Sequence, residues 1–305
     1  MISRRKFIGG VLGTLAGMSF LPDKSLSKQL HLIKRTIPSS GKLLPIIGMG
    51  TSRTFDVGSD KKKIAELGKV LRVFFDGGGA LIDSSPMYGS SERVLGELLK
   101  RTTNKQKLFS ATKVWTYGRA SGIKQMNESL KLWGLKRFDL MQIHNLRDWK
   151  EHIKTLRGWK DEGKIGYIGI TTSHGRDHEE FERIMKIQRL DFAQFSYNIE
   201  DRVAEKRLLP LAREKNVATI VNRPFQRGGL FRKVRGKPLP EWASEFDCKS
   251  WAQFFLKFIA SNPDVTNIIP ASSNVKHMAD NMAAGFGRLP NEKTRSRMIE
   301  YYEKL

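Results

Sequence analysis

Short apolar runs alternate with longer amphipathic segments along most of this chain. Eight runs predict buried strands, at residues 46–50, 81–83, 108–113, 140–144, 167–170, 192–195, 218–221 and 267–270. The segments between them, such as residues 91–99 and 201–215, carry apolar residues at helical spacing. Strands that alternate with helices in this way favour a closed (β/α)8 barrel, the TIM-barrel architecture, over an open doubly wound sheet.

Two features outside this repeat refine the fold prediction. Residues 30–43 predict a β-hairpin that turns at Ser40-Gly41. No Gly-x-Gly-x-x-Gly stretch follows an early strand, which argues against a Rossmann domain. The triplet Gly77-Gly78-Gly79 precedes a strand rather than a helix, so it predicts a helix stop and not a phosphate-binding loop.

Composition limits the classes of partner. The 305 residues suit one large domain or two small ones. The formal net charge of +23 would suit nucleic acid, anionic lipid or a phosphorylated ligand, or reflect no more than a basic proteome. Because no run of Lys and Arg is interleaved with aromatic residues, we expect no nucleic-acid partner. The single cysteine, Cys248, excludes an internal disulfide and a multi-cysteine metal site, and no His-x-x-x-His pair lies on an apolar helix face, so we expect no metal.

The N-terminal residues match the pattern of an export signal. Ser3-Arg4-Arg5-Lys6-Phe7-Ile8 resembles the twin-arginine signal, and the apolar stretch at residues 8–20 is short of the roughly 20 residues that a membrane span needs. We therefore predict a signal peptide over residues 1–27, a folded domain over residues 28–305, a periplasmic location, and the twin-arginine export machinery as a partner. The nearest small-x-small triplet is Ser25-Leu26-Ser27, which leaves open an uncleaved, membrane-anchored form. A plain basic arm is the other alternative.

Four polar residues gather at the predicted strand ends. Asp83, Lys113 and His144 close three of the apolar runs, and Tyr88 follows shortly after Asp83. The C-terminal strand ends of a β/α barrel meet at one face, where barrel enzymes carry their active sites. An ammonium beside a phenol lowers the pKa of the phenol, a carboxylate keeps the ammonium charged, and an imidazole donates a hydrogen bond. The four residues therefore predict a proton-donating site for the reduction of a carbonyl.

Two other interpretations of these residues stay open. They could be ordinary polar residues of the barrel mouth, with Lys113 and Asp83 as a structural salt bridge. Lys113 could instead form a Schiff base in an aldolase, although Asp83 beside it would keep the amine protonated and therefore a poor nucleophile.

A series of stretches, in a fixed order, resembles the aldo-keto reductase family. They are LPIIGMGTS, IDSSPMYGSSERVLG, LFSATKV, FDLMQIHN, GKIGYIGITTS, AQFSYN, VNRPFQRGGL and IIPASSNVKHMADNMAA, and the second is highly specific. The resemblance implies a (β/α)8 barrel whose N-terminal hairpin plugs the bottom. It implies that Tyr88 is the general acid/base and that Lys113, partnered by Asp83, tunes its pKa. It also implies that His144 orients the substrate.

The same resemblance implies a nicotinamide dinucleotide, with NADP(H) favoured over NAD(H). Two departures fall at the nicotinamide end, because Thr171-Thr172 replaces a Ser-Asn pair and Asn222-Arg223 stands where an aromatic residue usually stacks. Trp115 and Arg53 are expected to contact the substrate. The cofactor-binding residues that the resemblance implies are Thr51, Thr172, Gln194, Asn222, Arg223, Phe225, Gly228, Ser272, Ser273, Lys276, His277 and Asn281.

The expected function is an exported oxidoreductase that transfers a hydride from NADPH to an aldehyde, ketone or sugar carbonyl. Because free nicotinamide cofactor should be scarce outside the inner membrane, we expect it to be held tightly and recycled in place. The alternative is a barrel that keeps its nucleotide but serves as a redox sensor or partner-binding subunit with little turnover.

Overall fold

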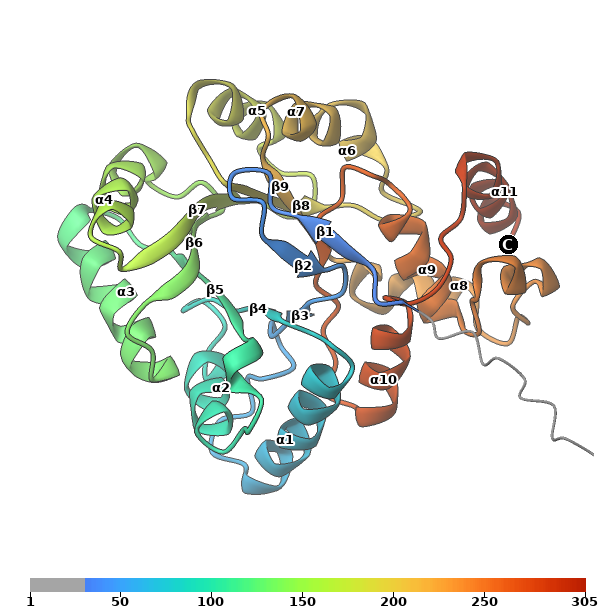
Figure 1. The fold of residues 1–305 in the computed structure, drawn as a ribbon, viewed down its shortest axis with the longest axis horizontal. Coiled ribbons are helices and arrows are strands. Elements are labelled where there is room, and N and C mark those ends of the chain that lie inside the picture. Colours follow the sequence, from blue (N-terminus) through green and yellow to red (C-terminus); the bar gives the residue numbers. More distant parts are fainter. Residues whose placement is uncertain (1–30) are drawn as a thin grey trace, which may run out of the picture. The chain divides into compact units, whose positions relative to one another are not determined.

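A sheet of eight parallel strands forms the centre of the molecule (Figure 1). The computed structural model describes residues 31–305, so the signal peptide predicted over residues 1–27 lies outside the described residues. The strands lie side by side in chain order, from β3 at one edge to β10 at the other. They are Met49–Gly50 (β3), Leu81–Asp83 (β4), Phe109–Val114 (β5), Phe138–His144 (β6), Ile165–Thr171 (β7), Phe192–Ser196 (β8), Ala218–Asn222 (β9) and Asn267–Ile268 (β10).

The two edge strands meet and close the sheet into a barrel. Ile47, just before β3, pairs in parallel with Ile268 of β10. The Gly48 amide donates to the Ile268 carbonyl and the Ile268 amide donates to the Ile46 carbonyl, each at 2.8 Å. The predicted (β/α)8 fold is confirmed, and each predicted strand is present, although the first and last are shorter than predicted.

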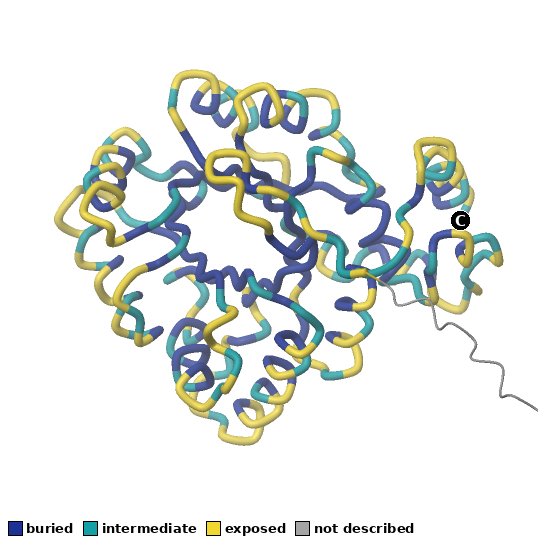
Figure 2. Tube along the Cα trace, in the orientation of Figure 1, coloured by how far each residue is buried: buried dark blue, intermediate teal, exposed yellow. Residues whose placement is uncertain are grey.

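Helices cover the outside of the barrel, so the ring of strands is buried while the outer helix faces are exposed (Figure 2). The main helices are Lys61–Asp76 (α1), Ser91–Lys100 (α2), Arg119–Trp133 (α3), Trp149–Asp161 (α4), His178–Ile187 (α5), Leu208–Glu214 (α7), Trp251–Ala260 (α9), Val275–Ala283 (α10) and Glu292–Glu303 (α11). Shorter helices are Val203–Lys206 (α6) and Gly229–Lys233 (α8), with 3-10 turns at Lys105–Lys107 (η1), Gln226–Gly228 (η2) and Glu241–Phe246 (η3).

Residues 201–215 form two helices rather than the single helix predicted. α6 and α7 meet at Arg207, whose backbone (φ −134°, ψ −59°) is not helical. Pro210 explains the break, because proline lacks an amide hydrogen and its ring clashes with the carbonyl four residues earlier.

The predicted hairpin is present and fills the lower end of the barrel. Lys34–Thr36 (β1) pairs with Leu43–Pro45 (β2) in antiparallel register, and the turn uses Gly41 at φ 75°. Ile37 and Leu44 of the hairpin pack in one cluster with Leu81, Phe109 and other residues at or near the strand beginnings. Those beginnings lie opposite the C-terminal ends, so the hairpin closes the barrel on the side away from the candidate site.

Helix α2, which begins just after Tyr88, is fixed by a buried carboxylate and by a close backbone contact. Glu92 is 2% exposed, and burial raises its pKa, which the hydrogen bonds it accepts oppose. Gly96 lets α2 approach α3, since a Cβ there would lie 1.8 Å from the Leu132 carbonyl oxygen. The donors to Glu92 are Thr112, Ser129 and Trp133, at 2.6, 2.9 and 3.0 Å.

In the part of the chain that the structure describes, no helix is both long and apolar enough to cross a membrane. Among residues 31–305, no three His, Cys, Asp or Glu side chains lie together as metal ligands would.

Candidate active site

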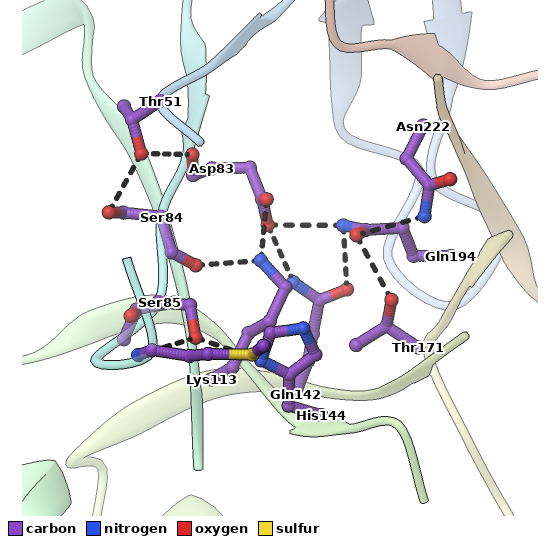
Figure 3. Close-up of polar contacts among 12 residues, drawn as sticks. Thr51, Asp83, Ser84, Ser85, Lys113, Gln142, His144, Thr171, Gln194 and Asn222 are labelled. Atoms are coloured by element: carbon purple, nitrogen blue, oxygen red, sulfur yellow. Dashed lines mark hydrogen bonds and ion pairs between the residues drawn. The ribbon is translucent and has the colours of Figure 1, made fainter. Parts of the chain in front are cut away.

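The four polar residues singled out in the sequence come together at the C-terminal end of the barrel. Asp83 ends β4, Lys113 lies near the end of β5 and His144 ends β6, so three adjacent strands supply three of them (Figure 3). Tyr88 comes from the loop between β4 and α2. Its ring meets the His144 ring edge to face at a centroid distance of 5.7 Å, and the Lys113 ammonium lies 5.2 Å from its centroid.

Lys113 and Asp83 form an ion pair that is closed to solvent. The two side chains are 0% and 2% exposed, and the Lys113 Nζ lies 2.5 Å from the Asp83 Oδ2. The same ammonium donates to the Ser84 carbonyl at 2.6 Å. Burial on its own lowers the pKa of Lys113, but Asp83 and Tyr88 together outweigh it and the pKa is raised. The lysine therefore stays charged.

The second carboxylate oxygen of Asp83 holds two amide side chains. Gln142 and Gln194 donate to the Asp83 Oδ1 at 2.9 and 3.1 Å (Figure 3). Gln194 was expected from the sequence as a cofactor-binding residue rather than as a partner of Asp83, and Gln142 was missed. The strand pattern could have predicted Gln142 as a site residue, because it lies two positions before His144 and so faces the same side of β6.

The pKa of Tyr88 is raised rather than lowered. Burial of its hydroxyl is the main cause, and the charge of Lys113 opposes it. The contribution of Lys113 therefore has the sign expected from the sequence, but desolvation is larger in this structure, and the expected net shift is wrong in direction. A protonated phenol beside a cation is a proton donor.

His144 is a neutral imidazole whose proton can be assigned. Burial, with Lys113 and Arg147 nearby, lowers its pKa to about 2. The Ser85 Oγ lies 2.8 Å from the Nδ1 and accepts the Met87 amide at 3.2 Å. Among residues 31–305 the Ser85 hydroxyl has no acceptor other than the Nδ1, so we assign the serine as donor. The ring proton is then on the Nε2, free to donate to a ligand.

The residues expected at the nicotinamide end are paired with one another. The Gln194 Oε1 accepts from Thr171 at 3.0 Å and from Asn222 at 3.4 Å. Asn222 also donates to the Thr172 carbonyl at 2.8 Å and accepts from Ser196 at 2.8 Å. The two departures from the expected pattern, at Thr172 and Asn222, thus meet in one network at the ends of β7 and β9.

Thr51, another residue expected to bind the cofactor, links strands at the barrel mouth. It is buried, and its Oγ1 lies 2.8 Å from the Ser84 Oγ and donates to the Asp83 carbonyl at 3.0 Å. Its side chain is therefore engaged within the barrel.

The residues expected near the far phosphate lie in the loop after β10 and on α10. The helix cap is Asn274, whose side chain accepts the amides of Lys276 and His277 at 2.9 and 3.1 Å. Ser272 is buried and accepts the Asn274 amide at 3.1 Å, so it supports the cap. Ser273, Lys276 and His277 are exposed, whereas Asn281 is 3% exposed.

Cations surround the mouth on several loops. Arg53, Arg223 and Arg227 have left-handed backbones, with φ 65°, 52° and 54°, a conformation that costs energy in a non-glycine residue. Within the described residues none of the three forms an ion pair. Phe225 and Gly228 lie in the same loop as Arg227, and a Cβ at Gly228 would meet nothing within 4 Å. Trp115, expected in the substrate pocket, lies 6.5 Å from His144 between ring centroids.

A family model described as the aldo/keto reductase family matches residues 46–296. The chain belongs to the aldo/keto reductase family. It is therefore an NAD(P)H-dependent oxidoreductase of that family, and the enzyme class expected from the sequence is confirmed.

This aldo/keto reductase is similar to curated and solved members of the family. It is 28% identical over 219 residues to aldo-keto reductase YhdN of Bacillus subtilis, covering 66% of this chain and 63% of that protein. It is 26% identical over 259 residues to methylglyoxal reductase YeaE of Escherichia coli, covering 82% and 89%. A crystal structure of an aldo/keto reductase from Klebsiella pneumoniae with NADP and acetate superposes with a TM-score of 0.75 at 21% identity, over 88% of this chain and 96% of that one.

The side chains around the mouth fit the dinucleotide that the family implies. Arg227 and Ser273 are exposed on the loops that follow β9 and β10, and Lys276 is exposed in the first turn of α10; cations with hydroxyls suit phosphate groups. The open space beside Gly228 leaves room for a ligand against the backbone. These residues would hold the phosphates, and Gln194 with Asn222 would hold the nicotinamide amide after exchanging their present partners.

Proposed function

We propose that this aldo/keto reductase reduces an aldehyde, ketone or sugar carbonyl with NADPH, with Tyr88 as the general acid. The observation that carries the proposal is the buried Asp83–Lys113 ion pair, whose ammonium lies 5.2 Å from the Tyr88 ring centroid, with the neutral His144 beside it. The bound dinucleotide would supply the hydride. Every other part of the reaction falls to side chains of this barrel.

Each side chain has a distinct task in this proposal. The raised pKa of Tyr88 keeps its proton in place at neutral pH until the carbonyl oxygen gains negative charge. Lys113 then stabilises the phenolate that remains, and Asp83 holds the ammonium in position. The Nε2–H of His144 donates a hydrogen bond to the carbonyl oxygen and orients it, while the ring keeps its proton.

The preference for NADPH rests on the charge of the phosphate-binding loops. Lys276 and Ser273 are exposed next to the start of α10, where a ribose phosphate would be neutralised. The Klebsiella pneumoniae structure carries NADP, whereas one Escherichia coli relative is an NADH-specific methylglyoxal reductase, so family members differ. Dissociation constants for NADPH and NADH, compared with those of Lys276→Met, test this preference.

Export to the periplasm is part of the proposal and rests on the sequence at Arg4 and Arg5. Replacing both arginines with lysine should retain the protein in the cytoplasm, as measured by cell fractionation. Equal periplasmic amounts of variant and parent would contradict a twin-arginine route.

The reaction is tested with Tyr88→Phe. Oxidation of NADPH at 340 nm with a panel of aldehydes should fall by about 10²–10⁴-fold. NADPH affinity should change little, because Tyr88 acts on the carbonyl. Tyr301→Phe, away from the strand ends, is the matched control. Equal loss of binding and turnover would make Tyr88 structural.

The second candidate function is a nucleotide-holding subunit with little turnover. The closed network of Thr171, Thr172, Gln194 and Asn222 favours it, since these groups must exchange partners to bind a nicotinamide. Tight NADPH binding without turnover of any carbonyl by the parent protein would support this candidate over the reductase.

A further inference from the structure

Arg147 is a cation without an acidic partner beside the candidate active site. It follows β6 shortly after His144 and is half-buried. Its guanidinium carbon lies 4.2 Å from the ring centroid of Trp115 and 5.0 Å from that of Tyr117. Within residues 31–305 the guanidinium forms no ion pair and donates no hydrogen bond, so two aromatic rings hold it while its N–H groups stay available.

The aromatic platform under Arg147 is fixed in place. The Trp115 amide donates to the Gln125 Oε1 at 2.6 Å, and the Gln125 Nε2 donates back to the Trp115 carbonyl at 3.2 Å. A ring nitrogen of His152 lies 2.9 Å from the Thr116 carbonyl. Two neighbouring helices, α3 and α4, therefore brace the loop that carries both aromatic residues.

The acid closest in sequence does not neutralise Arg147. The Asp148 Oδ2 instead accepts the Gly118 amide at 2.7 Å. Asp148 itself has φ 48°, a costly backbone conformation in a non-glycine residue. A guanidinium that only stiffened this loop could have paired with that carboxylate.

The platform lies next to the position proposed for the reacting carbonyl. Trp115 lies 6.5 Å from His144 between ring centroids, so the same indole contacts the guanidinium and lies near the imidazole. Arg147 follows β6, whereas Arg223 and Arg227 follow β9, which lies three strands away in the sheet. The residues suited to the dinucleotide phosphates and the Arg147 platform thus belong to different parts of the mouth.

We propose that the natural substrate is a carbonyl compound with a carboxylate at its other end, and that Arg147 binds this carboxylate. The inference rests on the proposed reductase function and narrows its substrate class. A planar guanidinium offers two parallel N–H donors to a carboxylate, and stacking on aromatic rings fixes the plane of that fork. A formal charge of +23 would also attract an anionic substrate to the enzyme.

The test compares aldehydes that carry a carboxylate with their neutral methyl esters. 4-Carboxybenzaldehyde is paired with methyl 4-formylbenzoate, and succinic semialdehyde with its methyl ester. In the parent enzyme kcat/KM should be about tenfold or more higher for the acid in at least one pair. Benzoate should also inhibit turnover of a neutral aldehyde more strongly than benzamide does. No preference in either pair, together with equal inhibition, would overturn the proposal without affecting the reductase, which the neutral esters report.

Two variants locate the source of the preference. Arg147→Met should remove it while changing kcat/KM for the neutral ester by less than about threefold, since methionine can still cover Trp115. Lys150→Met, an exposed cation on the adjacent α4, should keep the preference and controls for general charge. An acid preference that survives in Arg147→Met would place the carboxylate elsewhere. Loss of the preference in Lys150→Met would make it a long-range charge effect. Either result would refute the role of Arg147.

Discussion

Removing the charge of Asp83 should leave a buried ammonium without a counter-ion. Asp83→Asn keeps the shape of the side chain, while Lys113, which is 0% exposed, loses a partner at 2.5 Å. Breaking a buried ion pair from one side costs about 3–5 kcal/mol of unfolding free energy. The exposed Lys69–Glu66 pair provides the control, since Glu66→Gln should cost less than about 1 kcal/mol.

The loss of unfolding free energy caused by Asp83→Asn should become smaller as the pH rises. In the parent, Asp83 and Tyr88 outweigh burial and the pKa of Lys113 is raised. In the variant burial dominates, so this pKa falls below the ordinary value of about 10.4. The folded variant then binds fewer protons than its unfolded chain, and its unfolding free energy rises with pH toward about 10. The parent keeps its proton on Lys113 over this range, so the gap between the two proteins should narrow.

Urea unfolding followed by tryptophan fluorescence measures both effects. The comparison uses the difference between variant and parent at each pH from about 7 to about 9.5. Burial lowers the pKa of Lys257 to about 8. The titration of this and other groups contributes equally to both proteins, so it cancels in the difference. A cost no larger than that of Glu66→Gln, or a gap that stays constant with pH, would refute a buried ion pair between Lys113 and Asp83.

Three further predictions follow from the site and its supports. Ser85→Ala should lower kcat/KM for neutral aldehydes about tenfold without changing NADPH affinity, because His144 loses the hydrogen bond that keeps its proton on the Nε2. If 15N NMR of the ring shows that the Nε2–H tautomer is unchanged in the variant, this role of Ser85 is wrong. Carbonyl reduction should show no inflection near the ordinary histidine pKa of about 6.5, since the pKa of His144 is lowered to about 2; an inflection there that His144→Asn removes would contradict it. Gly96→Ala should destabilise the fold by about 3 kcal/mol or more, because the added Cβ forces α2 away from α3. Gly158→Ala, with open space around its Cβ, should instead stabilise the fold by about 0.5–1 kcal/mol. Equal effects of the two substitutions in urea unfolding would be inconsistent with the close contact.

The barrel could be predicted from the sequence because each strand is a local signal. Runs such as those ending at Asp83, Lys113 and His144 are apolar and short, and each ends on a polar residue. Since parallel strands align their C-terminal ends, that pattern alone placed the three side chains together. The single helix predicted over residues 201–215 failed for an equally local reason, because Pro210 cannot bond back to the preceding turn and the backbone breaks at Arg207.

The balance of forces at the site could not be predicted from the sequence. The charge of Lys113 near Tyr88 was foreseeable, but the depth of burial that outweighs it depends on packing by several loops. The partners of Ser85 and Gln142 depend on neighbouring strands and on the loop after β4. The cap of α10 by Asn274 depends on a side chain that reaches the amides of Lys276 and His277 in the folded loop.

The hairpin that fills the foot of the barrel also has a kinetic consequence. Because the hairpin covers the N-terminal end of the barrel, both reactants must enter and leave at the C-terminal end. The reactant that binds deeper has to bind first and dissociate last, and the other binds after it. The turnover sequence should therefore be ordered rather than random, and product-inhibition patterns would reveal that order.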